Sequence, residues 1–161
     1  MPKARLAIGL PGSGKSTFGQ RNAKHHLIIN RDAIRVMVYG GVYRFDFDYE
    51  ASIKDMALSC AYAALNDGHN VYIDETNLTK AGRAFWVENL SRAGFETTYY
   101  LFPENTRNLE YRSLDMRGFT KEYWSDVIEK MRPNYVPPAE DGSEGNVGLV
   151  VVDNPYVEFL P

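Results

Sequence analysis

The sequence predicts an α/β fold with a central parallel β-sheet flanked by helices. Short apolar runs alternate with segments of helical spacing, which is the pattern of successive βαβ units. A glycine-rich segment at residues 9–16 joins the first apolar run to the first helical segment. Polar side chains follow two later apolar runs, as expected where ligands bind beyond the carboxyl ends of parallel strands.

The N-terminal part of the chain contains two predicted strands and three predicted helices. Consecutive apolar residues predict the first strand over residues 4–9, and the segment 15–24 that follows the glycines can be helical. A second apolar run predicts a strand over 25–30, and a helix begins after it over 32–39. Apolar residues every three to four positions predict a long helix over 49–67.

The middle of the chain repeats the strand–helix–strand pattern. An apolar run predicts a strand over 70–74, after Gly68, which is placed to end the preceding long helix. A helix is predicted over 80–93, with a glycine directly after it. A run rich in tyrosine and threonine predicts the next strand, over 97–102.

The C-terminal part is predicted to hold a helical lid and a last strand. Helical spacing is present over 107–117 and again over 121–131, with a break at Gly118. Prolines, glycines and acidic residues predict a loop over 133–146, and an apolar run predicts a strand over 148–153.

Bulk properties indicate one cytoplasmic domain. A chain of 161 residues is long enough for a single buried core. Its longest apolar stretches have strand length, and its net charge of −3 argues against coating nucleic acid by charge alone. The single cysteine, Cys60, lies in an apolar helical pattern, where we expect a core thiol and no disulfide framework. We expect no membrane contact and no obligate protein partner.

The glycine-rich segment is a phosphate-binding loop. It reads G-x-x-x-x-G-K-S. Its residues that we expect to bind the nucleotide, together with the following threonine, are Gly9, Pro11, Gly12, Ser13, Gly14, Lys15, Ser16 and Thr17. Glycines let backbone amides surround a polyphosphate, and the helix N-terminus adds the positive end of its dipole. Lys15 can reach the β- and γ-phosphates, and Ser16 can hold Mg²⁺. We therefore expect a nucleoside triphosphate and Mg²⁺ as ligands.

Asp32 and Arg35 follow the second predicted strand. A carboxylate at a strand end beside a phosphate loop can accept a proton from a substrate hydroxyl. Arg35 lies one helical turn further on and can orient Asp32 or bind a substrate phosphate. The alternative is that Asp32 only caps the helix that begins there.

Asp74, Glu75, Thr76 and Asn77 follow the third predicted strand. A carboxylate at this position is expected to support Mg²⁺, and only one of Asp74 and Glu75 can face the nucleotide because the two side chains alternate in direction. Thr76 and Asn77 suit hydrogen bonding to the acceptor, or alternatively cap the next helix.

Arginine, histidine and aromatic side chains outside these motifs are further candidates for functional or structural roles. Arginines on a segment that closes over phosphates can neutralise transition-state charge, and Arg112 and Arg117 are favoured over Arg107 because Gly118 follows them. The three histidines are expected at the surface. Four alternating aromatic residues between 43 and 49 can stack on bases or pack into the protein.

Together these motifs resemble the 5′-kinase domain of bacteriophage polynucleotide kinase and its relatives. The resemblance covers residues 4–132 and rests on G-L-P-G-S-G-K-S-T, I-N-R-D-x-x-R, D-E-T-N-L and a pair of arginines before a helix. It implies a P-loop kinase fold and transfer of the γ-phosphate of ATP to a 5′-hydroxyl of DNA or RNA.

The resemblance also implies roles for individual residues. Asp32 would be the general base, and Arg35 would contact the phosphate on the 3′ side of the acceptor nucleoside. Lys15, Ser16 and Thr17 would bind ATP and Mg²⁺. The pair Thr76 and Asn77 matches the family's Thr-Asn. The arginines Arg112 and Arg117 would belong to a lid over about 107–132.

The chain departs from the family in three respects. The adjacent acids Asp74 and Glu75 leave the register of the family's carboxylate open, and Asp74 is favoured. Arg112 and Arg117 are one residue further apart than in close relatives. Bifunctional relatives carry a phosphatase motif of the form D-x-D-x-T, which is not found here, so a stand-alone kinase domain of the kind found in phages is expected.

Two other functions remain open from the sequence. A related P-loop kinase could phosphorylate another hydroxyl, such as a hydroxymethylated pyrimidine in phage DNA, a nucleoside or another small molecule. A nucleotide-binding regulatory module would need Asp32 to act only as a helix cap.

Overall fold

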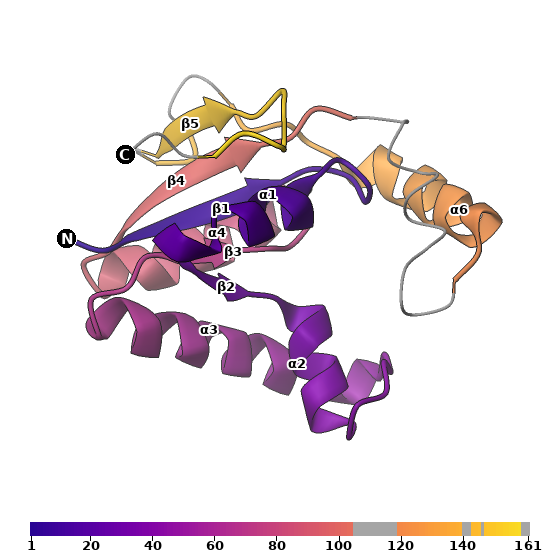
Figure 1. Ribbon diagram of the computed structural model, residues 1–161, viewed down its shortest axis with the longest axis horizontal. Helices are drawn as coiled ribbons and strands as arrows, with labels where there is room; N and C mark the ends of the chain where they lie inside the picture. Colours follow the sequence, from indigo (N-terminus) through magenta and orange to yellow (C-terminus); the bar gives the residue numbers. More distant parts are fainter. Residues whose placement is uncertain (105–118, 140–142, 146, 159–161) are drawn as a thin grey trace.

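The computed structural model describes residues 1–104, 119–139, 143–145 and 147–158. Five parallel strands in these residues form one sheet, in the order β2-β3-β1-β4-β5 (Figure 1). The strands are β1 (Lys3–Ile8), β2 (Leu27–Ile29), β3 (Val71–Ile73), β4 (Glu96–Leu101) and β5 (Gly148–Val151). The predicted α/β fold with a central parallel sheet is confirmed.

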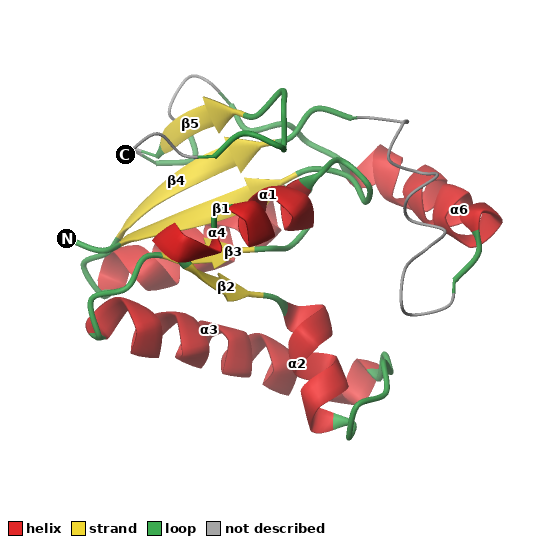
Figure 2. Cartoon of the chain, viewed as in Figure 1, coloured by secondary structure: helices red, strands yellow, loops and turns green. Residues whose placement is uncertain are grey.

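Helices connect the strands and flank the sheet (Figure 2). The α-helices are α1 (Lys15–Arg21), α2 (Arg31–Val38), α3 (Glu50–Asn66), α4 (Lys80–Arg92) and α6 (Lys121–Met131). Single turns of 3₁₀ helix are η1 (Ala23–His25), η2 (Phe47–Tyr49) and η4 (Arg132–Asn134). The first helix is shorter than predicted, and the helix predicted over 107–117 lies outside the described residues.

The alternation of side chains along the strands produces two apolar layers. Leu6 and Ile73 lie in the core cluster that also contains residues of α3 and α4. Ala7 is the neighbour of Leu6 on β1, and Tyr72 is the neighbour of Ile73 on β3. Both pack instead with Phe18 of α1. The sheet is therefore covered on both faces, as expected for a parallel sheet.

The strand register brings the carboxyl ends of three strands to one edge of the sheet. Ile73 of β3 pairs with Leu6 of β1 and with Ile29 of β2. The segments that leave these ends are the phosphate loop, the start of α2 and the turn before α4. Residues from distant parts of the sequence therefore meet there.

Two expectations about burial are wrong. Cys60 is exposed, because the buried stripe of α3 runs through Ala57, Ala61 and Ala64 and Cys60 lies beside it. His26 is only 4% exposed and stacks on Tyr72 with the ring centroids 4.9 Å apart. Its Nε2 lies 3.0 Å from the carbonyl oxygen of Gly19 on α1. Burial lowers the pKa of His26 to about 4.

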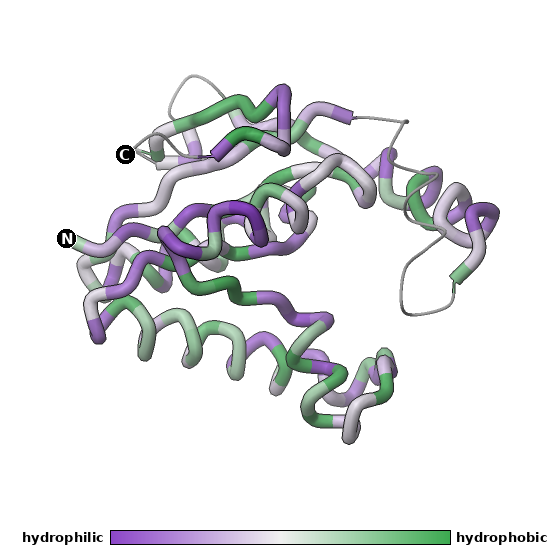
Figure 3. The backbone as a smooth tube through the Cα atoms, in the orientation of Figure 1, coloured by the Kyte–Doolittle hydropathy of each residue, from purple (hydrophilic) through white to green (hydrophobic). Residues whose placement is uncertain are grey.

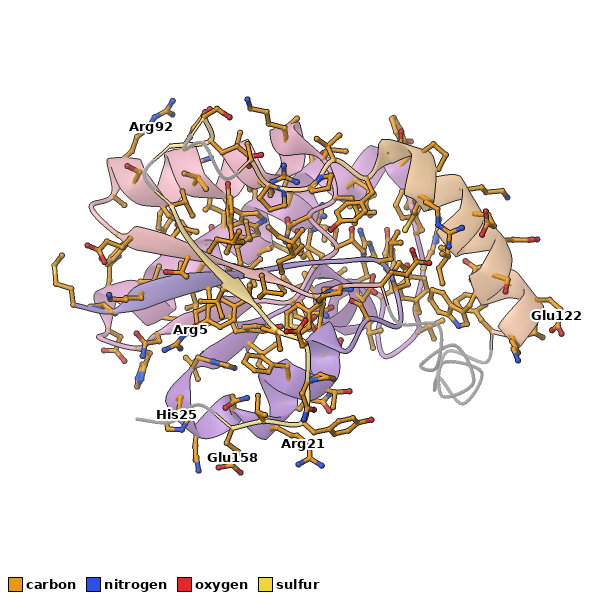
Figure 4. The ribbon with its side chains drawn as sticks, turned by 90° about the horizontal axis from the view of Figure 1, so that it is seen from above. Arg5, Arg21, His25, Arg92, Glu122 and Glu158 are labelled. Carbon is orange, nitrogen blue, oxygen red and sulfur yellow. The ribbon has the colours of Figure 1, made fainter. Side chains whose placement is uncertain are left out.

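β5 forms an edge of the sheet, and its hydrophobic residues stand out in Figure 3. The segment after it runs along α1, where Lys24 and Glu158 form an ion pair of 2.8 Å and Arg21 lies over the ring of Tyr156. Arg21, His25 and Glu158 accordingly lie on the same side of the molecule in Figure 4. No helix in the described ranges is long and apolar enough to cross a bilayer.

Candidate active site

The phosphate-loop sequence forms a tight turn between β1 and α1. Gly12 and Gly14 have φ angles of 82° and 100°, a region that residues with a Cβ rarely adopt. Gly9 is needed for a different reason, since a Cβ there would lie 2.8 Å from the carbonyl oxygen of Phe102. Its amide donates to the carbonyl of Thr76 at 3.0 Å. The loop is thus tied to the end of β3.

Lys15 is held against the loop, with only 7% of its surface exposed. Its ammonium group donates to the carbonyls of Gly9 and Leu10 at 2.9 and 2.8 Å. The hydroxyl of Tyr72 donates to the Lys15 carbonyl at 2.9 Å. The first turn of α1, which carries Lys15 and Ser16, is therefore fixed from the sheet below it.

A cavity of about 300 Å³ opens beside this loop. Seven of the residues predicted for the site line it: Pro11, Lys15, Ser16, Asp32, Arg35, Asp74 and Thr76. They come from the loop, from α2 and from the end of β3. The structure therefore brings together side chains that are up to 65 positions apart in the sequence (residues 11 and 76).

Asp32 and Arg35 are in direct contact. An Arg35 Nη1 donates to Oδ1 of Asp32 at 2.5 Å across one turn of α2. The cap of α2 is Asn30, whose Oδ1 accepts from the amide of Ala33 at 3.1 Å. The alternative that Asp32 is the N-cap is therefore wrong.

Glu50, the first residue of α3, completes this group. Its two carboxylate oxygens accept from Nε and Nη2 of Arg35 at 2.8 and 2.5 Å. These hydrogen bonds raise the pKa of Arg35 and lower the pKa of Glu50. Arg35 is only 7% exposed, and charge-assisted hydrogen bonds to both carboxylates fix its orientation.

Asp74 and Glu75 point to different surroundings. Asn30 donates to Oδ2 of Asp74 at 3.1 Å, and Asp74 lines the cavity beside Ser16. Glu75 forms an ion pair with Arg31 at 2.6 Å and accepts from the indole of Trp86 at 3.3 Å. Its side chain is 6% exposed, and burial raises its pKa.

The chemistry of the donor set fits a magnesium ion. Ser16 supplies a hydroxyl and Asp74 a carboxylate, and hard oxygen ligands of this kind are what Mg²⁺ takes, together with phosphate oxygens. Asp74 suits this role better than Glu75, because Glu75 already faces Arg31 and Trp86.

Thr76 and Asn77 separate in the structure. Thr76 lines the cavity, whereas the Asn77 side chain is buried and donates to the carbonyl of Ala7 at 2.8 Å. The φ angle of Asn77 is 45°, so the chain turns here and directs its side chain back to the sheet. Neither residue caps α4, whose cap is Thr79. Asn77 therefore does not line this cavity, although it lines a smaller cavity next to it.

Aromatic side chains from two distant segments form another wall of the cavity. They are Tyr43 and Phe45 from the loop after α2, and Phe119, Tyr123 and Trp124 from α6 and the residue pair before it. Phe119 stacks on Tyr123 with centroids 4.1 Å apart, and Tyr43 meets Phe119 edge to face. The guanidinium of Arg35 lies over the Phe45 ring.

α6 is attached to the phosphate loop through an apolar contact. Ile128 of α6 packs with Leu10 of the loop and Leu78 of the turn after β3. α6 is the described part of the segment expected to form a lid. Arg107, Arg112 and Arg117 lie outside the described residues.

Sequence reasoning missed Glu50 and Tyr72. Glu50 pairs with a residue 15 positions away and has the sequence context of an ordinary acidic helix start. Tyr72 sits inside an apolar strand pattern that carries no sign of its hydroxyl contact.

The comparisons with known proteins agree with this architecture. Residues 5–138 match the family described as AAA domain, AAA_33. A chain in the structure titled "Pnkp1/Rnl/Hen1 RNA repair complex" is similar with a TM-score of 0.67 and 23% identity, over 88% of this chain and 50% of that one. A second Pnkp1/Rnl/Hen1 complex gives 28% identity and a TM-score of 0.60, over 72% and 41%.

An APS kinase, CysC of Mycobacterium tuberculosis solved with AMPPNP and APS, is similar at 16% identity and a TM-score of 0.64, over 95% of this chain and 90% of that one. These likenesses show a P-loop kinase fold. The present chain spans half or less of the length of the two chains matched in the RNA repair complexes.

Proposed function

This chain belongs to the AAA_33 family of AAA domains, and from that premise we propose that it is an ATP-dependent polynucleotide 5′-hydroxyl kinase. It transfers the γ-phosphate of ATP to the 5′-hydroxyl of DNA or RNA. The family and the fold support a P-loop kinase that transfers phosphoryl groups. The choice of acceptor rests on the cavity.

The observation that carries the proposal is the contact between Asp32 and Arg35 within one cavity that also holds Lys15 and Ser16. A carboxylate next to the phosphate loop can act as a base, and the arginine beside it can bind a phosphate next to the reacting hydroxyl. A nucleotide at the 5′ end of a strand offers such a hydroxyl with a phosphate next to it.

In the proposed reaction, Asp32 accepts the proton of the 5′-hydroxyl as its oxygen attacks the γ-phosphorus. The bond between that phosphorus and the bridging β–γ oxygen breaks, and ADP leaves. Lys15 exchanges its loop carbonyls for phosphate oxygens and offsets their charge. Ser16 and Asp74 hold Mg²⁺, which neutralises phosphate charge when bound. The loop residues Gly9, Pro11, Gly12, Ser13, Gly14 and Thr17 complete the ATP site.

Arg35 and Thr76 bind the acceptor in this proposal. Arg35 keeps Glu50 on one edge of its guanidinium and turns another N–H toward the acceptor phosphate. Arg112 and Arg117 belong to the proposed lid and act on the transferred phosphate. The aromatic wall supports an acceptor with a base, because aromatic faces stack on any nucleobase.

The test is phosphoryl transfer from labelled ATP to a panel of acceptors. The panel contains 5′-hydroxyl DNA and RNA oligonucleotides, hydroxymethylated oligonucleotides with blocked 5′ ends, nucleosides, a sugar and adenylyl sulfate. Label on the 5′-hydroxyl oligonucleotides alone supports the proposal. Label on another acceptor instead identifies a kinase of different specificity, and ATP binding without any transfer identifies a regulatory module.

The variant Asp32→Ala tests the role of the proposed base. We expect it to lower kcat about a hundredfold or more while ATP still binds. The control is Asp67→Ala, which removes a carboxylate that is 82% exposed at the far end of α3. Unchanged transfer by Asp32→Ala would contradict the role of Asp32 as a base.

A further inference from the structure

A second cavity adjoins the first. It has a volume of about 250 Å³ and lies where the first turns of α4 face residues of α3 and the end of α6. The two cavities share four lining residues: Arg31, Glu75, Thr76 and Met131. The two cavities are therefore neighbours, and a strand that extends past Thr76 from the first would meet the second next.

Lys54 and Phe85 are the distinctive side chains of this second cavity. The ammonium of Lys54, on α3, lies 3.8 Å from the centroid of the Phe85 ring on α4. No carboxylate among the described residues forms an ion pair with Lys54, whereas Arg31 and Arg35 of the first cavity are paired with Glu75 and Glu50. An ammonium group has three donors, so contact with a ring face leaves donors for another partner.

The cation on the shared wall is already neutralised. Arg31 faces Glu75, whose side chain is buried, and the same carboxylate accepts from Trp86 at 3.3 Å. Lys54 is therefore the cation of this cavity whose charge is not balanced by a carboxylate among the described residues. A cavity that combines such a lysine with an aromatic ring offers a site for a phosphate and the base or sugar next to it.

We propose that the second cavity binds the second nucleotide of a single-stranded 5′-hydroxyl acceptor. Lys54 contacts its phosphate, and the ring of Phe85 packs against its base or sugar. This inference rests on the proposed kinase function, because it takes the strand to run from the hydroxyl at Asp32, past Arg35, into the adjoining cavity.

The arrangement predicts how the enzyme depends on acceptor length. A nucleoside 3′-monophosphate fills only the first cavity and cannot contact Lys54. A tetranucleotide is long enough to reach both cavities. The KM of the wild-type protein should therefore be lower for the tetranucleotide than for the nucleoside 3′-monophosphate. Removing the charge of Lys54 should make this difference smaller.

The experiment measures KM and kcat for both acceptors, as DNA and as RNA, at saturating ATP. We expect Lys54→Ala to raise KM for the tetranucleotide about tenfold and to leave KM for the nucleoside 3′-monophosphate unchanged, since one phosphate contact is lost. The slope of log KM against log salt concentration for the tetranucleotide should fall by about 0.7. Lys54→Arg should retain most of the affinity.

Two further variants separate the site from general effects. Phe85→Leu keeps an apolar side chain of similar size without the aromatic face, and should raise KM only for the tetranucleotide, about fivefold or more. Lys3→Ala removes one positive charge at the other end of the sheet, in an exposed ion pair with Glu96, and should change neither constant.

The outcomes are distinguishable. Equal changes of KM for the short and the long acceptor, or no change for either, would overturn the second-nucleotide site and leave the kinase proposal standing. Failure of the wild-type protein to phosphorylate any acceptor of either length would overturn the proposed function, and this inference with it.

Discussion

Arg35 on α2 and Glu50 at the start of α3 form a two-pronged ion pair, with donor–acceptor distances of 2.8 and 2.5 Å. A third hydrogen bond joins the same guanidinium to Asp32. Glu50 thus determines the position of the arginine that orients the proposed base, although it is itself on a different helix. This arrangement makes Glu50 a positioning residue.

Glu50→Gln should reduce kcat/KM for a 5′-hydroxyl oligonucleotide about tenfold and leave KM for ATP unchanged, because Arg35 loses a charge-assisted contact. The measurement is steady-state kinetics with each substrate varied in turn. Glu88→Gln, an exposed change on α4, is the control. A lower acceptor KM in Glu50→Gln would show that Glu50 competes with the acceptor for Arg35.

Tyr72→Phe should weaken ATP binding, because the Tyr72 hydroxyl holds the carbonyl of Lys15 at 2.9 Å. Tyr62→Phe removes an equally long hydrogen bond, to Asn89 on α4, away from the phosphate loop. Each change should lower the free energy of unfolding by about 1 kcal/mol. Titration with a fluorescent ATP analogue should reveal weaker binding in Tyr72→Phe alone, and equal affinities would contradict the link to the loop.

His26 should make the protein less stable as the pH falls from about 6.5 to about 4. Its folded-state pKa of about 4 is below its ordinary value of 6.5, so over this interval the unfolded chain binds a proton that the folded protein does not. The loss amounts to roughly 3 kcal/mol. Urea unfolding at several pH values should show a smaller decline in His26→Gln. His69→Gln, at an exposed position, should follow the wild-type curve.

Glu144→Leu should lower the free energy of unfolding by about 3–5 kcal/mol, because it leaves the buried guanidinium of Arg83 without its ion-pair partner. Arg83 is fully buried and also donates to the carbonyls of Asn77, Leu78 and Val136. Arg83 lowers the pKa of Glu144, so the stabilisation is present above the ordinary carboxyl pKa and is lost as the pH falls through the folded-state pKa. Urea unfolding of Glu144→Leu and Glu144→Gln at neutral pH tests this, and a loss below 1 kcal/mol in both would contradict it.

The parallel sheet was predictable because most strands are marked by consecutive apolar residues, β4 by its tyrosines and threonines, and most helices by their spacing. It was also predictable that one cavity would be lined by Asp32, Arg35, Asp74 and Thr76. Each follows the end of a parallel strand, and those ends share one edge of the sheet.

Contacts that depend on single turns or on long-range packing could not be predicted. Asn77 adopts a left-handed backbone conformation that directs its side chain away from the first cavity, and the alternation of an extended strand gives no sign of this turn. The surroundings of His26 depend on α1 crossing over Tyr72, which is a property of the assembled layers. The pairing of Arg35 with Glu50 likewise requires α2 and α3 to be packed together.

The two tryptophans of the chain lie on different cavities: Trp124 lines the first and Trp86 the second. Indole emission is sensitive to the polarity of its surroundings, so each cavity carries its own fluorophore. With Trp124 replaced by Phe, the remaining emission comes from Trp86, which contacts Glu75 in the second cavity. With Trp86 replaced by Phe, it comes from Trp124 on α6 in the first cavity. Occupancy of the two cavities can therefore be followed separately in solution, without attaching a dye.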